Sequence, residues 1–190
     1  MTSSIKFYDD LIISKAADED RILLWKIDGF STMNDEVQPE SIAPIVTCTD
    51  SSTKSAFGGK FQRLLIFDAI GSSTNWMRFG LFHEPGKHPI LALGQDTYAI
   101  TTHKMDWSML FWDLTLLEDL LDRSEDKATE YLSQDPLTPF PPHRKVKLPR
   151  LEKSPRSFCI RSIAWSPGGE WCVAVDESCY IHVLSRQLIK

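Results

Sequence analysis

The residues that could carry out chemistry in this chain of 190 residues are few and scattered. His83 and His88 flank a predicted turn and could form a metal pair, but no third ligand follows at a metal-site spacing. The stretch Gly58-Gly59-Lys60 lacks the glycine spacing and the Ser or Thr of a phosphate-binding loop. No Ser-His-Asp or Cys-His arrangement has local support. We therefore predict no catalytic residue, no metal site and no cofactor, and we expect that the protein is not an enzyme.

Residues 76–82, with the sequence WMRFGLF, contain an arginine within an otherwise apolar run. Bulky side chains alternate there with small or charged ones, which is typical of a β-strand. A strand in the middle of a core would not need Arg78. This arginine could form a buried ion pair, for which Asp68 or Asp96 could serve, or it could contribute to a binding site. The choice depends on the fold that surrounds it.

The composition is ordinary for a soluble globular protein, with 42% hydrophobic and 25% charged residues. The formal net charge of -5 argues against direct, charge-driven recognition of nucleic acid and allows binding of a basic peptide tail. No signal core or membrane-length apolar run is present, so we expect no membrane association. The four cysteines form no CxxC pair, which favours free thiols in a reducing compartment, with Cys172 buried in a strand.

Short β-rich runs recur along the chain, bounded by turn residues. The stretches SPGGE (166–170) and HEPGKHP (83–89) place Pro and Gly between apolar runs, as tight turns require. Such turns join antiparallel strands, so we predict antiparallel sheets. The predicted strands are residues 10–17, 21–27, 61–69, 75–82, 88–94, 108–114, 144–151, 159–166, 170–176 and 179–185.

Two segments interrupt this pattern. Residues 29–60 are rich in Ser, Thr, Asp and Gly, and we predict a loop there. In residues 115–143 apolar side chains recur near helical spacing, with charged ones between them. This spacing predicts an amphipathic surface helix over 115–133, which the stretch DPLTPFPP ends. The helix could pack on its own domain or dock a partner protein.

The strand groups repeat. In LIISKAADEDRILLWKI an apolar strand leads through an acidic turn to a strand with Trp25 near its end. The same order recurs before Trp112-Asp113, and again in the last strands, where Val183 takes the Trp position. This order is typical of the blades of a WD-repeat β-propeller. We therefore predict an all-β fold: a WD40-type β-propeller of which only the C-terminal blades are present, with one inserted amphipathic helix.

The predicted domains are an incomplete blade (1–70), a blade with the helical insertion 115–143 (71–152) and a last blade (153–190). A propeller typically has about four to eight blades, and these strands suffice for about two and a half. An open stack exposes apolar faces and unpaired edges. We expect the N-terminal blades to be missing from this sequence rather than to come from another chain. Residues 1–190 alone should then be poorly soluble or molten, which a sharp cooperative melt of a monomer would contradict.

Three stretches resemble the Polycomb EED (extra sex combs) family, in the same order. They are DDLIISKAADEDRILLWKIDG, then NWMRFGLF with ILALGQD and LFWDL, and finally CIRSIAWSPGGEWCVAVDESCYIHVLSR. They match that family's strand ending in Trp-Lys, its aromatic-Met-Arg-Phe strand with the Trp-Asp strand that follows, and its final blade. The resemblance covers nearly the whole chain except residues 29–60 and 115–143, and only the C-terminal part of the family's propeller.

The resemblance implies a non-catalytic subunit of Polycomb repressive complex 2, located in the nucleus and supporting gene silencing. The family reads trimethyl-lysine on histone H3 with an aromatic cage at one end of its central channel. It grips a helix of the SET-domain methyltransferase subunit on the opposite face. The implied partners are therefore that methyltransferase, the trimethylated histone H3 tail and other Polycomb subunits, with no membrane and no direct sequence-specific contact to nucleic acid.

The resemblance also implies four residues that bind the methyl-lysine peptide: Asn75, Trp76, Arg78 and Arg161. Two adjacent cage aromatics precede Met-Arg-Phe in the family, and here Trp76 keeps a ring while Asn75 does not. Arg78 would brace cage rings or loop carbonyls, and Arg161 would lie near the same end of the channel, where the family holds the peptide backbone. With Asn75 the cage either binds more weakly or is lost. A lost cage would leave a generic WD-repeat scaffold, with Trp76 covering a blade turn at the rim.

Overall fold

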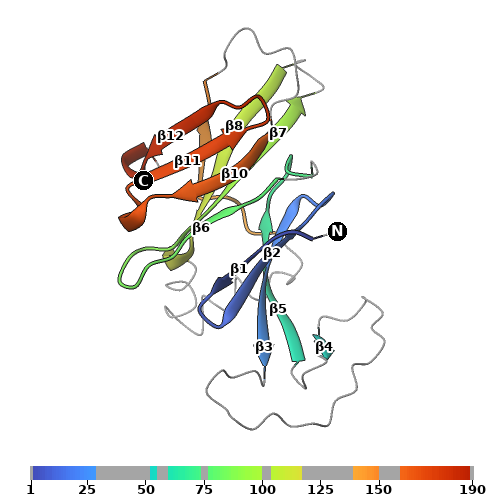
Figure 1. The fold of residues 1–190 in the computed structure, drawn as a ribbon. Coiled ribbons are helices and arrows are strands. Elements are labelled where there is room, and N and C mark those ends of the chain that lie inside the picture. Colours follow the sequence, from blue (N-terminus) through green and yellow to red (C-terminus); the bar gives the residue numbers. More distant parts are fainter. Residues whose placement is uncertain are drawn as a thin grey trace.

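The structure is a computed structural model that describes residues 2–28, 52–54, 60–73, 77–99, 104–116, 139–149 and 159–188. Three antiparallel sheets lie next to one another (Figure 1). The helical residues of this part of the chain are 114–116 and two short 3-10 turns, η1 (Pro167–Gly169) and η2 (Arg186–Leu188). No helix among the described residues is long and apolar enough to cross a membrane. The predicted all-β class is confirmed.

Each sheet is built mainly from strands that are consecutive in the chain. The first sheet has the order β1-β2-β3-β5-β4 and consists of β1 (Thr2–Tyr8), β2 (Leu11–Ala16), β3 (Arg21–Asp28), β4 (Ser52–Lys54) and β5 (Lys60–Asp68). The second consists of β6 (Gly80–Phe82), β7 (Ile90–Ala99), β8 (Lys104–Asp113) and β9 (Arg144–Lys147). The third consists of β10 (Ile160–Trp165), β11 (Trp171–Asp176) and β12 (Ile181–Ser185).

The two predicted turns have the expected chemistry. Between β10 and β11 the backbone N–H of Gly169 donates to the carbonyl of Ser166 at 2.9 Å. Gly168 has a φ of 79°, a left-handed conformation that a side chain would strain. In the β6–β7 turn Gly86 has a φ of 74°. Both turns therefore need glycine, and both join antiparallel strands as predicted.

The second and third sheets pack closely through glycines. A Cβ atom on Gly80 would lie 2.6 Å from Ile163, and one on Gly94 would lie 2.4 Å from Ile160. Further along the same two strands, the rings of Phe82 and Trp165 have centroids 5.8 Å apart. Gly80 faces Ile163, and two residues later Phe82 faces Trp165. The strands β6 and β10 therefore run in the same direction.

The first and second sheets share a core cluster. The rings of Phe67 and Trp112 meet edge to face, with centroids 5.8 Å apart. The segment before β9 ties the sheets together through Phe140. Its N–H donates to the Ile66 carbonyl at 2.6 Å, and its carbonyl accepts from Asp68 N–H at 2.8 Å. The same carbonyl accepts from the indole of Trp112 at 3.3 Å.

Three details differ from the sequence prediction. The strand β1 was not predicted, and it adds a strand to the first sheet. The strand β4 lies inside the predicted loop 29–60, so a loop does not account for its three residues. Within the described part of the predicted strand 75–82, residues 80–82 pair with β7 and residues 77–79 make no ladder with it. Most of the predicted helix 115–133 and most of loop 29–60 lie outside the described residues.

Candidate functional site

Arg78 and Arg161 lie at the same end of the sheets. Arg78 precedes Gly80 by two residues on the segment that enters β6, and Arg161 precedes Ile163 by two residues in β10. Because Gly80 meets Ile163 and the two strands run in the same direction, the two arginines are level with each other. The resemblance implies that both arginines lie at one end of the channel, and their part in peptide binding stays a prediction.

Arg78 is held by its neighbours. Met77 and Phe79 are 0% and 2% exposed and belong to the core cluster, whereas the Arg78 side chain is exposed. The two apolar side chains therefore anchor the segment and direct the guanidinium outward. An exposed Arg78 does not fit the alternative of a buried ion pair. Asn75 and Trp76 lie outside the described residues.

Arg161 is half-buried and forms an ion pair with Glu177 of the β11–β12 turn. The N–H of Glu177 donates to the carbonyl of Cys159 at 2.9 Å, which fixes the turn beside the start of β10. The fork of a guanidinium has five N–H groups, which can donate to several acceptors at once. A peptide carbonyl at this end would be a suitable partner.

Asp176 gives the same turn its shape. Its carboxylate is buried, and one oxygen accepts from the N–H groups of Ser178 at 2.8 Å and Tyr180 at 2.9 Å. The other oxygen lies 3.1 Å from Nε2 of His182. A buried carboxylate with several partners makes a rigid turn, because losing any partner leaves charge unsatisfied in the core. The turn therefore holds Glu177 in place for Arg161.

Two positioning residues at this end escaped the sequence prediction. Asp20 belongs to the acidic turn of the first repeat, and its carboxylate accepts from the Ser72 N–H at 2.9 Å. Gln95 donates to the Ile70 carbonyl at 2.6 Å and accepts from Ser108 Oγ at 2.9 Å. Together they fix the segment that leads toward Arg78. A polar residue such as Gln95 within an apolar strand is the sequence signal that could have revealed this.

The acidic turn also faces a buried cation. Lys15 is 0% exposed, and its ammonium donates to the Ala16 carbonyl at 3.1 Å. Burial lowers the pKa of Lys15 below the usual range for lysine, and the carboxylates of Asp20 and Glu19 partly oppose this. The Asp20 carboxylate therefore accepts a hydrogen bond from the backbone N–H of Ser72 and also stabilises the positive charge of Lys15.

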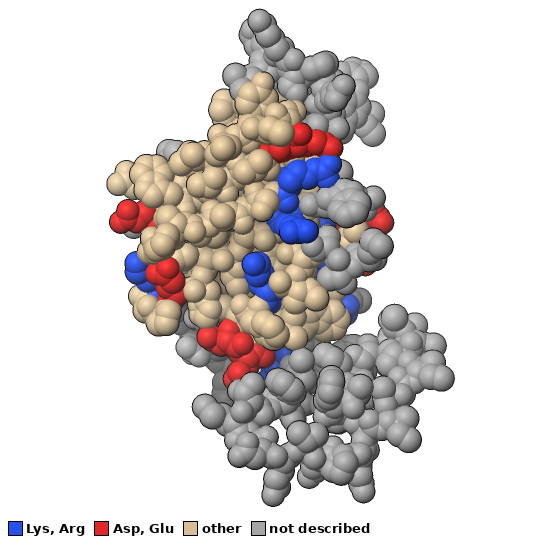
Figure 2. Space-filling view, viewed as in Figure 1, with Lys and Arg blue, Asp and Glu red and all other residues tan. Residues whose placement is uncertain are grey.

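The chemistry available at this end is binding. Guanidinium groups donate hydrogen bonds and attract anions or carbonyl oxygens, and they do not act as nucleophiles or bases at neutral pH. Among the described residues no group of three or more His, Cys, Asp or Glu side chains could hold a metal. Figure 2 shows small, separate groups of both signs among the described residues of one face, so these residues form no broad basic surface there.

The comparisons with known proteins agree with the predicted resemblance. No protein-family model matches the chain. The Polycomb protein EED of Chaetomium thermophilum is 36% identical over 124 residues, which are 60% of this chain and 20% of that protein. The resemblance to Polycomb EED is confirmed. The chain thus spans about a fifth of the length of this EED.

Solved structures of Polycomb repressive complex 2 (PRC2) show the same fold. A chain in the structure of ctPRC2 in complex with H3K27me3 and H3K27M has a TM-score of 0.68 and 23% identity, over 98% of this chain and 51% of that one. A chain in Chaetomium thermophilum Polycomb Repressive Complex 2 bound to GSK126 has a TM-score of 0.68 and 25% identity, over 97% and 49%. This EED-like chain therefore has the predicted fold of a partial WD40-type β-propeller, about half as long as the chains it matches.

Proposed function

We propose that the protein is a non-catalytic scaffold subunit of a PRC2-like histone H3 lysine methyltransferase and acts in the nucleus. The observation that carries this proposal is the 36% identity to Polycomb EED over 124 residues. Three sheets, of which the second and third pack closely at glycines, suit a scaffold. The partners we propose are a SET-domain methyltransferase subunit and other Polycomb subunits.

We further propose that the end marked by Arg78 and Arg161 reads trimethyl-lysine. A trimethylammonium group cannot donate a hydrogen bond, so it is held by ring faces, each worth about 0.5–2 kcal/mol. Trp76 would supply such a face two residues before Arg78, and Arg161 would hold a peptide carbonyl. A solved PRC2 with a similar chain contains H3K27me3, which supports this class of ligand. Asn75 supplies no ring, and this favours a weaker cage or the alternative of a scaffold without methyl-lysine binding.

A peptide titration tests the reader. The natural protein is titrated with trimethylated and with unmodified histone H3 peptide, each fluorescently labelled. We expect a preference for the trimethylated peptide that Trp76→Ala lowers about tenfold, as loss of one ring predicts. Arg161→Gln is the matched control, because it should lower the affinity for both peptides equally. Equal affinity of the unchanged protein for both peptides would exclude methyl-lysine recognition and leave only the scaffold function.

Co-purification tests the scaffold independently. A tagged full-length protein should recover a SET-domain methyltransferase from nuclear extract, and the Trp76→Ala variant should recover it equally well. If no methyltransferase co-purifies, a generic WD-repeat scaffold in another assembly is favoured.

A further inference from the structure

A lysine occupies a core position of the first sheet. The buried side chains of β2 are Ile13 and Lys15, which are both 0% exposed and alternate with half-buried neighbours. Ile13 belongs to the core cluster that the first and second sheets share, and Lys15 lies on the same face of the strand. A lysine is rarely buried in this way, because its charge loses the stabilisation that water gives. The ammonium of Lys15 therefore depends on partners within the protein.

The ammonium of Lys15 meets a carbonyl and the acidic turn 17–20 that follows β2. It donates to the carbonyl of Ala16 at 3.1 Å. Burial lowers the pKa of Lys15, and the carboxylate of Asp20 opposes this more than any other group. The other opposing groups are Glu19, the Cys159 thiol and Asp18. Asp20 is therefore the main charge partner of this lysine.

Asp20 connects the buried charge to the turn that follows β5. Its carboxylate accepts from the N–H of Ser72 at 2.9 Å, and its backbone carbonyl accepts from the N–H of Ala69 at 3.0 Å. The N–H of Ser72 also donates to the Ala69 carbonyl at 3.0 Å, and both residues are 0% exposed. One residue thus fixes both ends of the turn 69–72.

The turn 69–72 leads into the segment that carries two candidate peptide-binding residues. Trp76 and Arg78 follow Ser72 by four and six residues. Met77 and Phe79, on either side of Arg78, belong to the same core cluster as Ala69. A displacement of the turn is therefore transmitted to Arg78 through a short stretch of chain and through a shared core.

We propose that Lys15 is a positioning residue for methyl-lysine reading: its buried charge orients the Asp20 carboxylate, which fixes the turn before Trp76 and Arg78. The inference rests on the proposed reader function. Replacing a buried charge by an apolar side chain of similar volume often leaves stability unchanged or raises it. A residue that only fills the core at this position therefore does not need the charge, whereas a residue that orients Asp20 does.

The first test measures peptide affinity and Tm of Lys15→Met in the natural protein. We expect the affinity for trimethylated histone H3 peptide to fall about fivefold, as loss of an indirect contact predicts, while Tm is unchanged or rises. Asp20→Asn should cause a similar loss, and the double variant should bind no more weakly than either single one, because the two residues act as one unit. Asp18→Asn, on the exposed part of the same turn, should leave the affinity unchanged.

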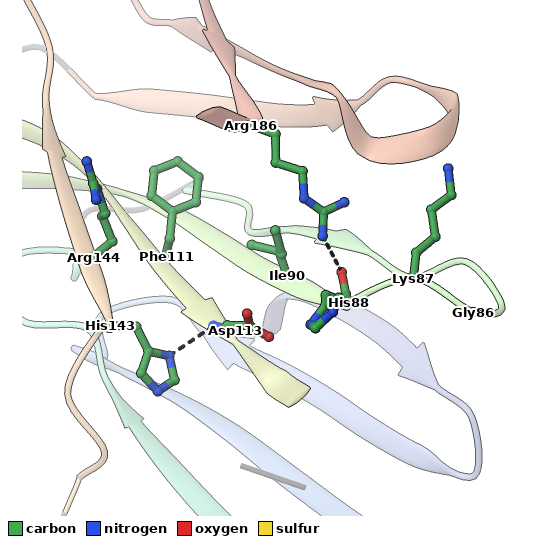
Figure 3. A pocket seen from close by; sticks show the side chains of 9 residues that line it. All are labelled: Gly86, Lys87, His88, Ile90, Phe111, Asp113, His143, Arg144 and Arg186. Atoms are coloured by element: carbon green, nitrogen blue, oxygen red, sulfur yellow. Dashed lines mark hydrogen bonds between the residues drawn. The ribbon is translucent and has the colours of Figure 1, made fainter. Parts of the chain in front are cut away.

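Lys87→Met is the matched control for the lysine substitution. Lys87 lies in the β6–β7 turn at the opposite end of the sheets, beside a pocket of about 470 Å³ (Figure 3). Its side chain is 45% exposed, so its charge is solvated. Lys87→Met should therefore leave the peptide affinity unchanged. A loss equal to that of Lys15→Met would show a general effect of net charge and would overturn the proposal.

The second test removes the charge of Lys15 by pH. A trimethylammonium group has no proton to lose and arginine stays charged, so these groups do not titrate near pH 9. Burial lowers the pKa of Lys15, so it loses its charge at a lower pH than exposed lysines do. The affinity ratio of the unchanged protein to Lys15→Met should be about five at pH 7 and approach one as the pH rises. A ratio that stays constant between pH 7 and pH 10 would contradict a role for the charge.

Hydrogen exchange separates this proposal from the reader function itself. Lys15→Met and Asp20→Asn should speed exchange of the Ser72 N–H in the protein without peptide, which mass spectrometry of fragments measures. Unchanged exchange, with a preserved preference for the trimethylated peptide, would overturn the role of Lys15 and keep the reader. Faster exchange, with equal affinity of the unchanged protein for both peptides, would remove the reader and confirm only that Lys15 fixes the turn. If Lys15→Met does not fold, Asp20→Asn decides both tests.

Discussion

Both faces of the third sheet carry apolar side chains, but one face is buried and the other is exposed to solvent. Leu184 is 6% exposed and packs in the core cluster shared with the second sheet. Its neighbour Val183 points to the other face and is 59% exposed. Ile181 and Trp171 lie on that same open face and are 66% and 48% exposed. An apolar side chain on these strands is thus buried only where a neighbouring sheet covers it.

The first sheet shows the same contrast at the other end of the row. Tyr8 of β1 is 6% exposed and faces the second sheet, whereas Ile5 and Phe7 are 56% and 72% exposed. Both outer faces of the three-sheet row therefore present apolar side chains. Exposed apolar patches of this kind mark surfaces that meet another element. The contrast teaches that an apolar side chain of these strands stays exposed on the two faces that no described sheet covers.

The sharpest test of the contrast compares two neighbouring residues of β12. Leu184→Ala should lower the free energy of unfolding by about 3 kcal/mol, because it leaves a cavity between two sheets. Val183→Ala should change it by less than about 0.5 kcal/mol, because its side chain is largely solvated. Urea denaturation of the 190-residue chain measures both values, and a cooperative transition in this experiment would also contradict the expectation that the chain alone is molten. Equal losses would show that the outer face is covered, and the contrast would fail.

A second test overfills the covered face. Gly94→Ala places a methyl group 2.4 Å from Cβ of Ile160, so the second and third sheets must move apart. Overpacking of this kind costs about 2 kcal/mol of unfolding free energy. Ser162→Ala, on the open face of β10, is the control and should cost less than about 0.5 kcal/mol. Differential scanning calorimetry would show a lower Tm for Gly94→Ala alone, and an unchanged Tm would mean that the sheets do not meet there.

The smallest expected effect concerns two cysteines of the third sheet. Burial on the covered face raises the pKa of the Cys172 thiol to about 12, whereas Cys179 is exposed in the β11–β12 turn. Iodoacetamide at pH 8 should therefore label Cys179 and spare Cys172 until the chain is unfolded, which peptide mass spectrometry can follow. The thiol has a pKa of about 8.5 in the unfolded chain. The stability that the buried, neutral thiol contributes is therefore fully present below that pH and is lost as the pH rises toward 12. Rapid native labelling of Cys172 would contradict its burial.

The sequence predicted the parts of the fold that local chemistry determines. The turn at Gly168 needs a left-handed backbone, and Trp112 ends a strand in the repeat, so both features were visible in the residue types. The strand β1 was missed because TSSIKFY mixes polar and apolar residues without a clear period, and its pairing with β2 decides its conformation. Tertiary pairing of this kind leaves little trace in one sequence.

The candidate sites divide in the same way. Arg78 stood out because a charge in an apolar run is unusual, and the structure shows its side chain exposed. Lys15 gave no such signal, because a lysine beside an acidic turn looks like ordinary surface. The bond from Ser72 to Asp20, a residue 52 places earlier, arises only when the turn after β5 packs against the turn before β3. Contacts across such separations cannot be read from spacing.

The bonds around residues 114 and 140 have a consequence for how such a chain can change in length. Leu114 N–H donates to the carbonyl of Pro89 at 3.0 Å where β8 ends. Phe140, where the chain returns toward β9, is bonded to Ile66, Asp68 and Trp112. The sheets are thus fastened on both sides of the intervening stretch by groups that do not belong to it. Residues can be added to or removed from that stretch during evolution, or replaced by a reporter domain, without moving the register of a single strand.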